Sequence, residues 1–171
     1  VAKKIGKTAE AQKLIDSLRQ RIEYVKTKPT KSRPKVLCIE WLDPLFTAGH
    51  WVPQMVEIVA GINGISAVGE PSRRMKIQEA TAFDPDIIVL MPCGFDINRT
   101  KQEYSKLAAN KEWKKLRAVE NNNVYAVDAN SYFSKPGPRT ITGIEILAKI
   151  IHPETFGELK IPAGSFSQIS S

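Results

Sequence analysis

The sequence has few of the residues that build small disulfide folds, zinc sites or membrane spans. Its 171 residues include two cysteines, Cys38 and Cys93, which are too few for a disulfide scaffold and lack the spacing of a zinc site. No apolar run approaches the roughly 18 residues that a membrane-spanning helix needs. Val1 does not open a charged and apolar leader, and the chain runs from it directly into a predicted helix. We therefore expect a globular domain that is part of a longer protein.

Motifs of the common enzyme classes are missing as well. There is no G-x-S-x-G nucleophile elbow, no Walker-type phosphate loop and no H-E-x-x-H zinc motif. A small α/β enzyme could still use Asp43 as an acid, His50 as a base and Cys93 as a nucleophile, and this is one alternative hypothesis. These groups stand among bulky aromatic residues, as in a recognition surface, so we predict no catalytic residues and a protein that is not an enzyme.

The charge of the chain is positive but is not concentrated. Lys and Arg number 25 against 18 Asp and Glu, which gives a formal net charge of +7. A nucleic-acid-binding surface usually combines clustered Lys and Arg with aromatic residues, whereas here the cations are scattered along the sequence. We expect a solvated, lysine-rich surface and no nucleic-acid partner.

The distribution of apolar residues predicts the fold class. With 42% hydrophobic and 25% charged residues, the chain suits one domain with a sizeable core. Short continuous apolar runs, typical of buried parallel strands, alternate with amphipathic segments typical of helices. The expected strands are 36–39, 65–68, 87–91 and 124–128, and the expected helices are 8–26, 52–60, 75–83, 99–109 and 139–151. This order predicts an α/β fold, a three-layer sandwich with a mainly parallel central sheet.

The first part of the chain predicts one long helix ahead of the sheet. Apolar residues recur there at helical spacing, and the set is Leu14, Ile15, Leu18, Ile22 and Val25. Two prolines and four cations follow in the stretch TKPTKSRPK, which has little to bury. We therefore divide the chain into a long amphipathic linking helix at 1–28, a linker at 29–35, an α/β ligand-binding lobe at 36–160 and a frayed tail at 161–171.

Three loops hold residues that a plain connection would not need. They follow the first, third and fourth predicted strands, at 40–53, 92–98 and 129–139. In a parallel sheet the loops after the strands meet at the carboxyl edge, which is where ligands bind. Their aromatic residues are Trp41, Phe46, Trp51, Phe95, Tyr132 and Phe133. We expect these rings to form one broad apolar rim for a large, partly apolar ligand.

Three stretches of the sequence together resemble a known protein family. They are VLCIEWLDPLFTAGHWVPQMVEI, RRMKIQEATAFDPDIIVLMPCGFD and VYAVDANSYFSKPGPR. In this order they resemble the carboxy-terminal lobe of the cobalamin-type, class III periplasmic substrate-binding proteins of ABC importers, over residues 36–154. The resemblance implies two lobes joined by one long helix, of which this chain would hold the helix and the second lobe. It also implies an extracytoplasmic location and weak ligand binding by this lobe alone.

The resemblance further implies a ligand and protein partners. Cobalamin or a related corrinoid would be the transported ligand, and the partners would be the membrane subunits of an ABC transporter and the missing N-terminal lobe. No resident cofactor and no metal site of the protein's own are expected. The ligand-binding residues would be Trp41, Asp43, Pro44, Phe46, His50, Trp51, Phe95, Tyr132, Phe133, Gly137 and Arg139.

Several residues of this set keep alternative interpretations. Asp43 and Pro44 would offer an acceptor to a corrin amide, or could simply shape a turn. Trp51 would contact the ligand, or could pack beneath the following helix. His50 would be a hydrogen-bonding rim residue rather than a cobalt ligand, because cobalamin carries its own lower base. Arg139 stands in the first turn of a predicted helix, where a cation is unfavourable, which hints at an anionic partner; otherwise it reaches solvent.

Two polar residues are candidates for contact with the transporter. Members of the resembled family place an acid on this lobe that pairs with arginines of the membrane subunits, and the matching position here is Gln78. The role would then pass to Glu79 or be lost, and both residues could equally be solvated helix positions.

Haem or a ferric siderophore is the alternative cargo for a protein of the same class. Tyr132 or His50 would ligate haem iron, whereas Arg139 would meet an anionic siderophore complex. If the strand order resembles that of flavodoxin, Cys38 and Cys93 would lie on neighbouring strands. We nevertheless expect buried free thiols rather than a disulfide.

Overall fold

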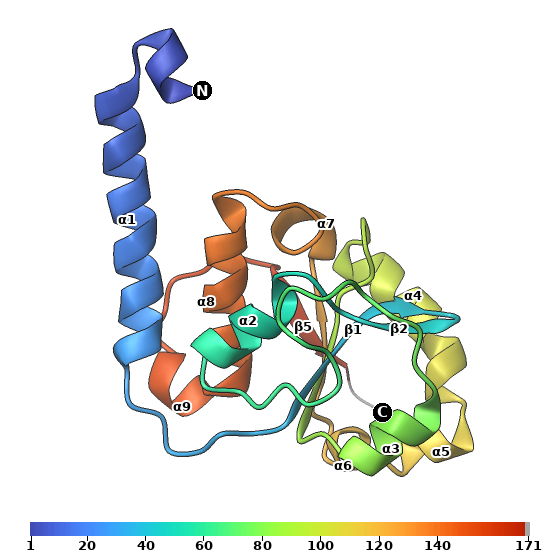
Figure 1. Cartoon of the computed structure of the whole chain (residues 1–171). Helices are drawn as coiled ribbons and strands as arrows, with labels where there is room; N and C mark the ends of the chain where they lie inside the picture. The colour runs from blue at the N-terminus through green and yellow to red at the C-terminus, as the bar shows by residue number, and fades with distance from the viewer. Residues whose placement is uncertain (170–171) are drawn as a thin grey trace.

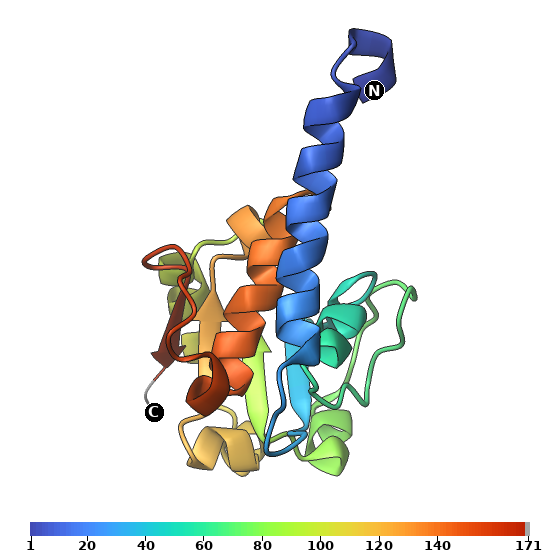
Figure 2. The same ribbon diagram turned by 90° about the vertical axis from the view of Figure 1, so that its left-hand side faces the viewer.

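The computed structural model describes residues 1–169 and contains one five-stranded sheet between two layers of helices (Figures 1 and 2). The strands are β1 (Val36–Leu42), β2 (Leu45–Thr47), β3 (Ile87–Leu90), β4 (Val124–Val127) and β5 (Phe166–Ile169). Their order across the sheet is β2-β1-β3-β4-β5. The central strands β1, β3 and β4 are parallel, and the edge strands β2 and β5 are antiparallel to their neighbours. The predicted α/β sandwich with a mainly parallel sheet is confirmed.

The helices differ in length and in the face of the sheet that they cover. They are η1 (Ala2–Ile5, a 3₁₀ helix), α1 (Thr8–Thr27), α2 (Val52–Ile58), α3 (Ile77–Phe83), α4 (Ile97–Ala108), α5 (Lys111–Lys114), α6 (Arg117–Glu120), α7 (Ala129–Tyr132), α8 (Arg139–Ile151) and α9 (Pro153–Phe156). Helices α1, α2, α8 and α9 cover one face, and α3 to α6 cover the other.

Alternation along the strands divides the core into two layers. Val36 and Cys38 of β1 pack into the layer under α2 and α8, whereas Leu37 and Ile39 pack into the layer under α3 to α6. Successive side chains of a strand point to opposite faces, so both faces of this continuous apolar run are buried. This pattern explains why β1 carries no polar residue before Glu40.

Two expectations about strands were wrong. Residues 65–68 form no strand, and the nearby pairing with the start of β1 is a single parallel bridge between Lys35 and Ile62. The tail that was expected to fray, at 161–171, instead contains β5, which pairs antiparallel with β4; residues 170 and 171 of that prediction lie outside the described residues. The backbone groups along the free edge of β4 need hydrogen-bond partners, and β5 supplies them. Phe166 also packs against Tyr125, with ring centroids 6.2 Å apart.

The long helix expected at 8–26 is confirmed as α1, and the short helix η1 precedes it within the 1–28 segment. Gly6 adopts a left-handed conformation, with φ 69°, and separates η1 from α1. The lower part of α1 packs against α8, where Val25 is buried, and the upper part projects beyond the carboxyl edge of the sheet (Figures 1 and 2). Leu14 and Ile15 on that upper part are 49% and 42% exposed.

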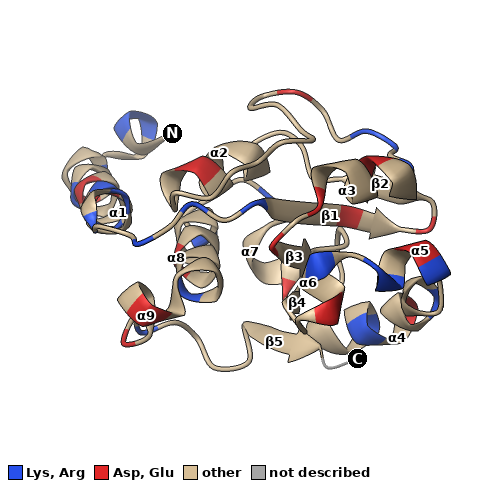
Figure 3. Ribbon diagram, turned by 90° about the horizontal axis from the view of Figure 1, so that it is seen from below, with Lys and Arg blue, Asp and Glu red and all other residues tan. Residues whose placement is uncertain are grey.

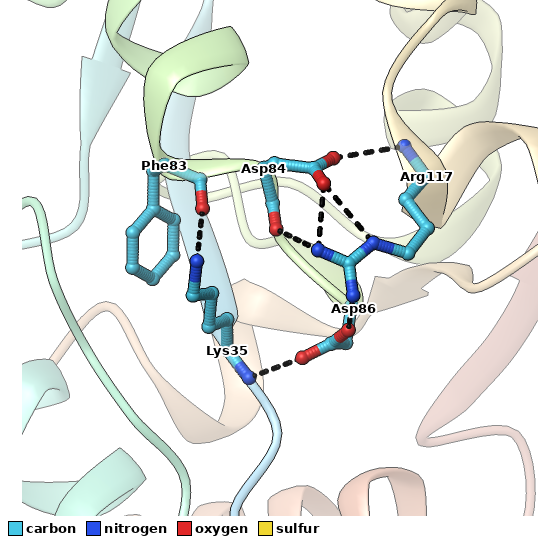
Figure 4. Close-up of polar contacts among 5 residues, drawn as sticks. All are labelled: Lys35, Phe83, Asp84, Asp86 and Arg117. Atoms are coloured by element: carbon cyan, nitrogen blue, oxygen red, sulfur yellow. Dashed lines mark hydrogen bonds and ion pairs between the residues drawn. The ribbon is translucent and has the colours of Figure 1, made fainter.

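At the amino edge of the sheet, an arginine joins two loops (Figure 4). The Nε and Nη2 atoms of Arg117 donate to the Oδ2 atom of Asp84 at 3.0 and 2.6 Å, and its Nη1 atom donates to Asp86 at 2.7 Å. Asp86 also accepts from the backbone N–H of Lys35 at 2.8 Å. The start of β1, the turn before β3 and the start of α6 are thereby held together at the edge opposite the three aromatic loops.

Charged residues are distributed over many elements. Viewed from below, Lys and Arg lie on α1, α4, α5, α6 and α8, with Asp and Glu between them (Figure 3). Within residues 1–169, no helix combines the length and the apolar character that a membrane crossing requires. The same residues contain no group of three or more His, Cys, Asp or Glu side chains arranged to hold a metal ion.

Candidate functional site

The three aromatic loops meet at the carboxyl edge of the sheet, as expected. The ring of Trp41, at the carboxyl end of β1, and the ring of Phe95, in the loop after β3, lie 5.3 Å apart between centroids. The backbone N–H of Gly94 donates to the hydroxyl of Ser134 at 2.9 Å, and that of Asn130 donates to the carbonyl of Phe95 at 3.1 Å. These bonds join the β3 loop to α7 and its following loop. The loops therefore form one surface rather than three separate ones.

A hollow of about 260 Å³ opens between these loops, and we call it the rim pocket. It is lined by Glu40, Gly49, His50, Trp51, Val52, Met91, Cys93, Phe133 and Ser134. Its apolar walls come from α2, from the end of β3 and from the residue after α7. Ligand pockets that enclose a whole molecule span roughly 300–1,000 Å³, so the rim pocket suits one part of a larger ligand.

His50 stands at the mouth of the rim pocket in an unusual conformation. Its φ is 57°, in the left-handed region that non-glycine residues seldom adopt and that costs on the order of 1–3 kcal/mol. Two backbone hydrogen bonds hold it there, from its N–H to the carbonyl of Glu70 at 2.6 Å and to its carbonyl from Gly69 at 3.0 Å. The imidazole is consequently exposed beside Trp51, with ring centroids 5.8 Å apart.

A carboxylate lies on one wall of the rim pocket. The Oε2 atom of Glu40 accepts from the hydroxyl of Ser72 at 2.7 Å and from the backbone N–H of Gly49 at 3.5 Å. Gly49 fits only because it lacks a side chain, since a Cβ there would collide with the backbone of Pro71 and Ser72. Residues 70–72 therefore pack directly against Gly49, and the hydroxyl of Ser72 orients the carboxylate of Glu40.

Trp51 both packs in the core and contributes to the rim pocket. Its ring is half-buried against the layer under α8, and its indole N–H donates to the carbonyl of Phe133 at 3.2 Å. The two interpretations of Trp51, ligand contact and packing at the following helix, are therefore compatible in this structure. Phe133 itself is buried and also lines the rim pocket.

The two cysteines have opposite environments, and both are free. Cys38 is buried within β1, and burial raises the pKa of its thiol to about 12. Cys93 is exposed at the rim pocket, so the expectation that both thiols are buried is wrong for this residue. The sequence contained a signal for this exposure, because Cys93 follows the apolar run of the third strand and precedes a glycine. In the structure, Gly94 has a φ of 77° and turns the chain out of the sheet.

Several predicted ligand-binding residues lie outside the rim pocket. Asp43 and Pro44 form the tight turn between β1 and β2 and line a separate groove of about 690 Å³ with Gln78 and Glu79. The enzyme alternative is not supported, because this turn places Asp43 in a different hollow from the other two members of the proposed triad. Six further residues that were predicted to bind the ligand do not line the rim pocket: Trp41, Phe46, Phe95, Tyr132, Gly137 and Arg139.

Among these, Trp41 and Phe95 form a ring pair at the carboxyl edge of the sheet, whereas Phe46 lies on the edge strand β2. Phe95 is only 6% exposed and lies between the ring of Trp41 and the guanidinium of Arg99, which sits 3.7 Å from its ring centroid. Trp41 is 39% exposed and donates its indole N–H to the carbonyl of Asp43 at 3.1 Å. Tyr132 packs against the core under α8 instead of reaching the pocket. Phe95 therefore supports the ring of Trp41, which is the exposed member of the pair.

The two candidate residues for contact with the transporter, Gln78 and Glu79, differ in their hydrogen bonding within the chain. Glu79 accepts from Arg73 at 2.7 Å and from the backbone N–H of Lys76 at 2.9 Å, which caps α3. The hydrogen bond from Arg73 lowers the pKa of the Glu79 carboxyl. Glu79 is thus already paired within the chain, while Gln78 is exposed.

Comparisons with known proteins agree with this architecture. A family profile described as "Periplasmic binding protein" matches residues 1–131. The high-affinity heme uptake system protein IsdE of Staphylococcus aureus is 28% identical over 129 residues, which is 72% of this chain and 44% of that protein.

Two solved structures show the same fold. An ABC transporter substrate-binding protein from Listeria monocytogenes superposes with a TM-score of 0.75 at 22% identity, over 87% of this chain and 59% of its own. A periplasmic heme binding protein from Pseudomonas aeruginosa gives a TM-score of 0.77 at 16% identity, over 99% and 62%. The chain thus spans about half the length of the curated relative and about three fifths of these structures. The chain belongs to the periplasmic binding protein family.

Proposed function

We propose that this chain is the carboxy-terminal lobe of the substrate-binding component of an ABC importer and that its rim pocket contacts a metal tetrapyrrole, haem in preference to cobalamin. The lobe would bind its cargo outside the cytoplasm and deliver it to membrane subunits. It would carry out no chemistry and hold no resident cofactor, because the cargo is transported.

The observation that carries the proposal is the pairing of apolar walls with iron-binding side chains at one pocket. The half-buried Trp51 and the buried Phe133 contribute to the apolar lining, and His50 and Cys93 are the exposed members of the same lining. Imidazole and thiolate are both common axial ligands of haem iron. Haem has axial positions to offer such groups, whereas cobalamin brings its own lower base. The named relatives from Staphylococcus aureus and Pseudomonas aeruginosa support haem as the cargo.

The geometry of the rim pocket also favours a ligand that is bound between this lobe and a second one. The rim pocket is open and smaller than a pocket that encloses its ligand, so a second lobe would supply the other wall. Affinity that depends on two walls falls steeply when one is removed. We therefore expect weak binding by the isolated chain, with a Kd no tighter than about 10 μM, near −7 kcal/mol.

A spectral titration tests the proposal. Ferric haem and aquocobalamin are each titrated into the chain at high protein concentration, and the absorbance of the tetrapyrrole is followed. A saturable change in the haem Soret band that is lost in the double variant His50→Gln and Cys93→Ser supports haem ligation at the rim pocket. The matched control is Cys38→Ser, which removes the buried thiol.

Two outcomes would contradict the proposal. Haem binding that survives the double variant unchanged in affinity and spectrum would place the cargo elsewhere. A saturable response to aquocobalamin with none to haem would reverse the preference and return cobalamin as the cargo.

A further inference from the structure

Glu40 is a charged residue on an otherwise apolar row of β1. Val36 and Cys38, which precede it on the same face of the strand, are buried in the layer under α2 and α8. Glu40 itself is half-buried and lines the rim pocket. A carboxylate in such a position costs free energy unless hydrogen bonds replace the water that it has lost. The hydrogen-bond partners of Glu40 therefore indicate its role.

Strand β1 is irregular at this residue. In the pairing of β1 with β2, Ile39 lies opposite Thr47 and Trp41 lies opposite Phe46. Because Phe46 and Thr47 are consecutive, Glu40 is the extra residue of a β-bulge. Bulges are frequent beside functional sites, where they redirect a side chain. Here the bulge leaves Glu40 without an opposite residue on β2, and its side chain lies at the rim pocket.

The carboxylate of Glu40 joins the two backbone segments that surround His50. Its Oε2 atom accepts from the hydroxyl of Ser72 at 2.7 Å and from the backbone N–H of Gly49 at 3.5 Å. Gly49 directly precedes His50 in the chain, and Ser72 belongs to the segment that packs against it. One side chain thus fixes the distance between these segments.

The conformation of His50 depends on that distance. Its N–H donates to the carbonyl of Glu70 at 2.6 Å, and its carbonyl accepts from the N–H of Gly69 at 3.0 Å. These two bonds offset the unfavourable left-handed backbone, whose φ is 57°. Without the contact between Glu40 and Ser72, residues 69–70 can move away, and His50 can then relax to an ordinary backbone conformation.

The effect should be confined to the His50 side of the pocket. The backbone carbonyl of Glu40 accepts from the N–H of Cys93 at 3.2 Å, and this bond does not involve the carboxylate. The N–H of Thr47 donates to the carbonyl of Arg73 at 3.0 Å and fixes the same segment to β2 independently of Glu40. Replacement of the Glu40 side chain should therefore release His50 and leave Cys93 and β2 in place.

We infer that Glu40 is a positioning residue, whose carboxylate holds the left-handed backbone of His50 and thereby directs the imidazole toward the cargo. This inference rests on the proposed function and specifies how the site is kept ready for its ligand. When His50 adopts the binding conformation in only a fraction of the molecules, the apparent affinity falls in proportion to that fraction.

The backbone of His50 can be measured by NMR without any ligand. At a φ of about 60° the amide and α protons of a residue are nearly eclipsed, so the cross-relaxation between them is strong. Glu40→Ala and Ser72→Ala should weaken this signal for His50. Glu40→Gln should keep most of it, because an amide oxygen can accept the same hydrogen bonds. The matched control is Glu57→Ala, which removes an exposed carboxylate from α2 and should leave the signal unchanged.

Haem titration of the same variants gives the functional arm. Glu40→Ala should raise the Kd for ferric haem about tenfold, which corresponds to the binding conformation of His50 in about a tenth of the molecules. It should also shift the Soret band toward that of His50→Gln. In a His50→Gln background, Glu40→Ala should weaken binding no further, because the two residues act as one unit. The labelling rate of the Cys93 thiol should stay at the wild-type value, which shows that the pocket is still folded.

The outcomes separate this inference from the proposed function. A strong His50 signal that survives in Glu40→Ala overturns the inference and leaves the proposed function standing. Equal losses of affinity in Glu40→Gln and Glu40→Ala, or a further loss caused by Glu40→Ala in the His50→Gln background, would overturn it as well. If the wild type shows no response to haem, the proposed function is contradicted, while the His50 signal still decides whether Glu40 sets the conformation of that residue.

Discussion

The indole ring of Trp41 meets the ring of Phe95 edge to face, at an interplanar angle of 62° and a centroid distance of 5.3 Å. This contact joins the carboxyl end of β1 to the loop after β3. The two partners differ in exposure, since Phe95 is 6% exposed and Trp41 is 39% exposed. Their roles should differ accordingly.

Substitution of each ring should separate binding from stability. Trp41→Ala should lower the free energy of unfolding by less than about 1 kcal/mol, because much of the ring is already in water. Phe95→Ala should lower it by about 3 kcal/mol, because a cavity replaces a buried ring. Urea unfolding measures both, and haem titration should show weaker binding for Trp41→Ala. A larger stability loss for Trp41→Ala than for Phe95→Ala would contradict the assignment.

The two thiols should react at very different rates in the native protein. Burial raises the pKa of Cys38 to about 12, so almost no thiolate is present there at pH 8, whereas Cys93 is exposed. Labelling with a thiol-specific disulfide reagent should modify one thiol quickly in native protein and two in denaturant. Cys93→Ser should abolish the fast phase. Two fast thiols in the native wild type would show that β1 does not enclose Cys38.

The attachment of α1 should depend on one bidentate ion pair. The Nε and Nη2 atoms of Arg21 donate to the two carboxylate oxygens of Glu145 on α8, at 2.8 and 2.6 Å. Glu145→Gln should cost about 1–3 kcal/mol in unfolding free energy and speed hydrogen exchange of the α1 amides. The matched control is Glu23→Gln, an exposed position on α1. Unchanged exchange in α1 would mean that apolar packing alone holds the helix.

Acid should weaken the contact between Asp84 and Arg117. Hydrogen bonding to Arg117 lowers the pKa of the Asp84 carboxyl in the folded state. The stabilisation is therefore complete above the unfolded pKa of about 3.9 and is lost as the pH falls through the lower, folded pKa. Asp84→Asn should reduce the urea midpoint at neutral pH and match the wild type at the acid limit. Asn tolerates the left-handed backbone of this residue, whose φ is 46°.

The comparison for Asp84 needs a charge control. Glu158→Gln removes an exposed carboxylate at another position and should leave the shape of the pH profile unchanged. A difference between wild type and Asp84→Asn that stays constant down to strongly acidic pH would mean that the charge of Asp84 does not contribute.

The layers of the fold could be predicted from the sequence because they depend on local periodicity. Val36 to Ile39 alternate between two cores, and a continuous apolar run is typical of such a strand. Strand β5 was missed because Ser167 and Gln168 interrupt its apolar residues and its partner β4 lies some 40 residues earlier in the sequence. Strand β5 forms because β4 has an unpaired edge, and that edge exists only once the sheet has folded.

The candidate site was predictable at the level of loops but not of side chains. The convergence of the loops follows from a parallel sheet. The exposure of His50, by contrast, follows from hydrogen bonds to residues about 20 positions away, at Gly69 and Glu70. The separate groove of Asp43 follows from the turn at Asp43 and Pro44, which was one of the two interpretations of these residues, and from the strand β2 after it, which the sequence pattern did not predict. Long-range contacts of this kind set the direction of loop side chains and leave no local periodic signal.

The indole N–H signals of the three tryptophans test most directly whether haem binds at the carboxyl edge. Trp41 and Trp51 lie at that edge, whereas Trp113 is fully buried in the layer under α3 to α6. Paramagnetic ferric haem broadens nearby NMR signals and leaves distant ones sharp. We predict that the Trp51 and Trp41 signals disappear on addition of haem while that of Trp113 remains. Loss of the Trp113 signal with Trp41 and Trp51 unaffected would contradict the proposed site.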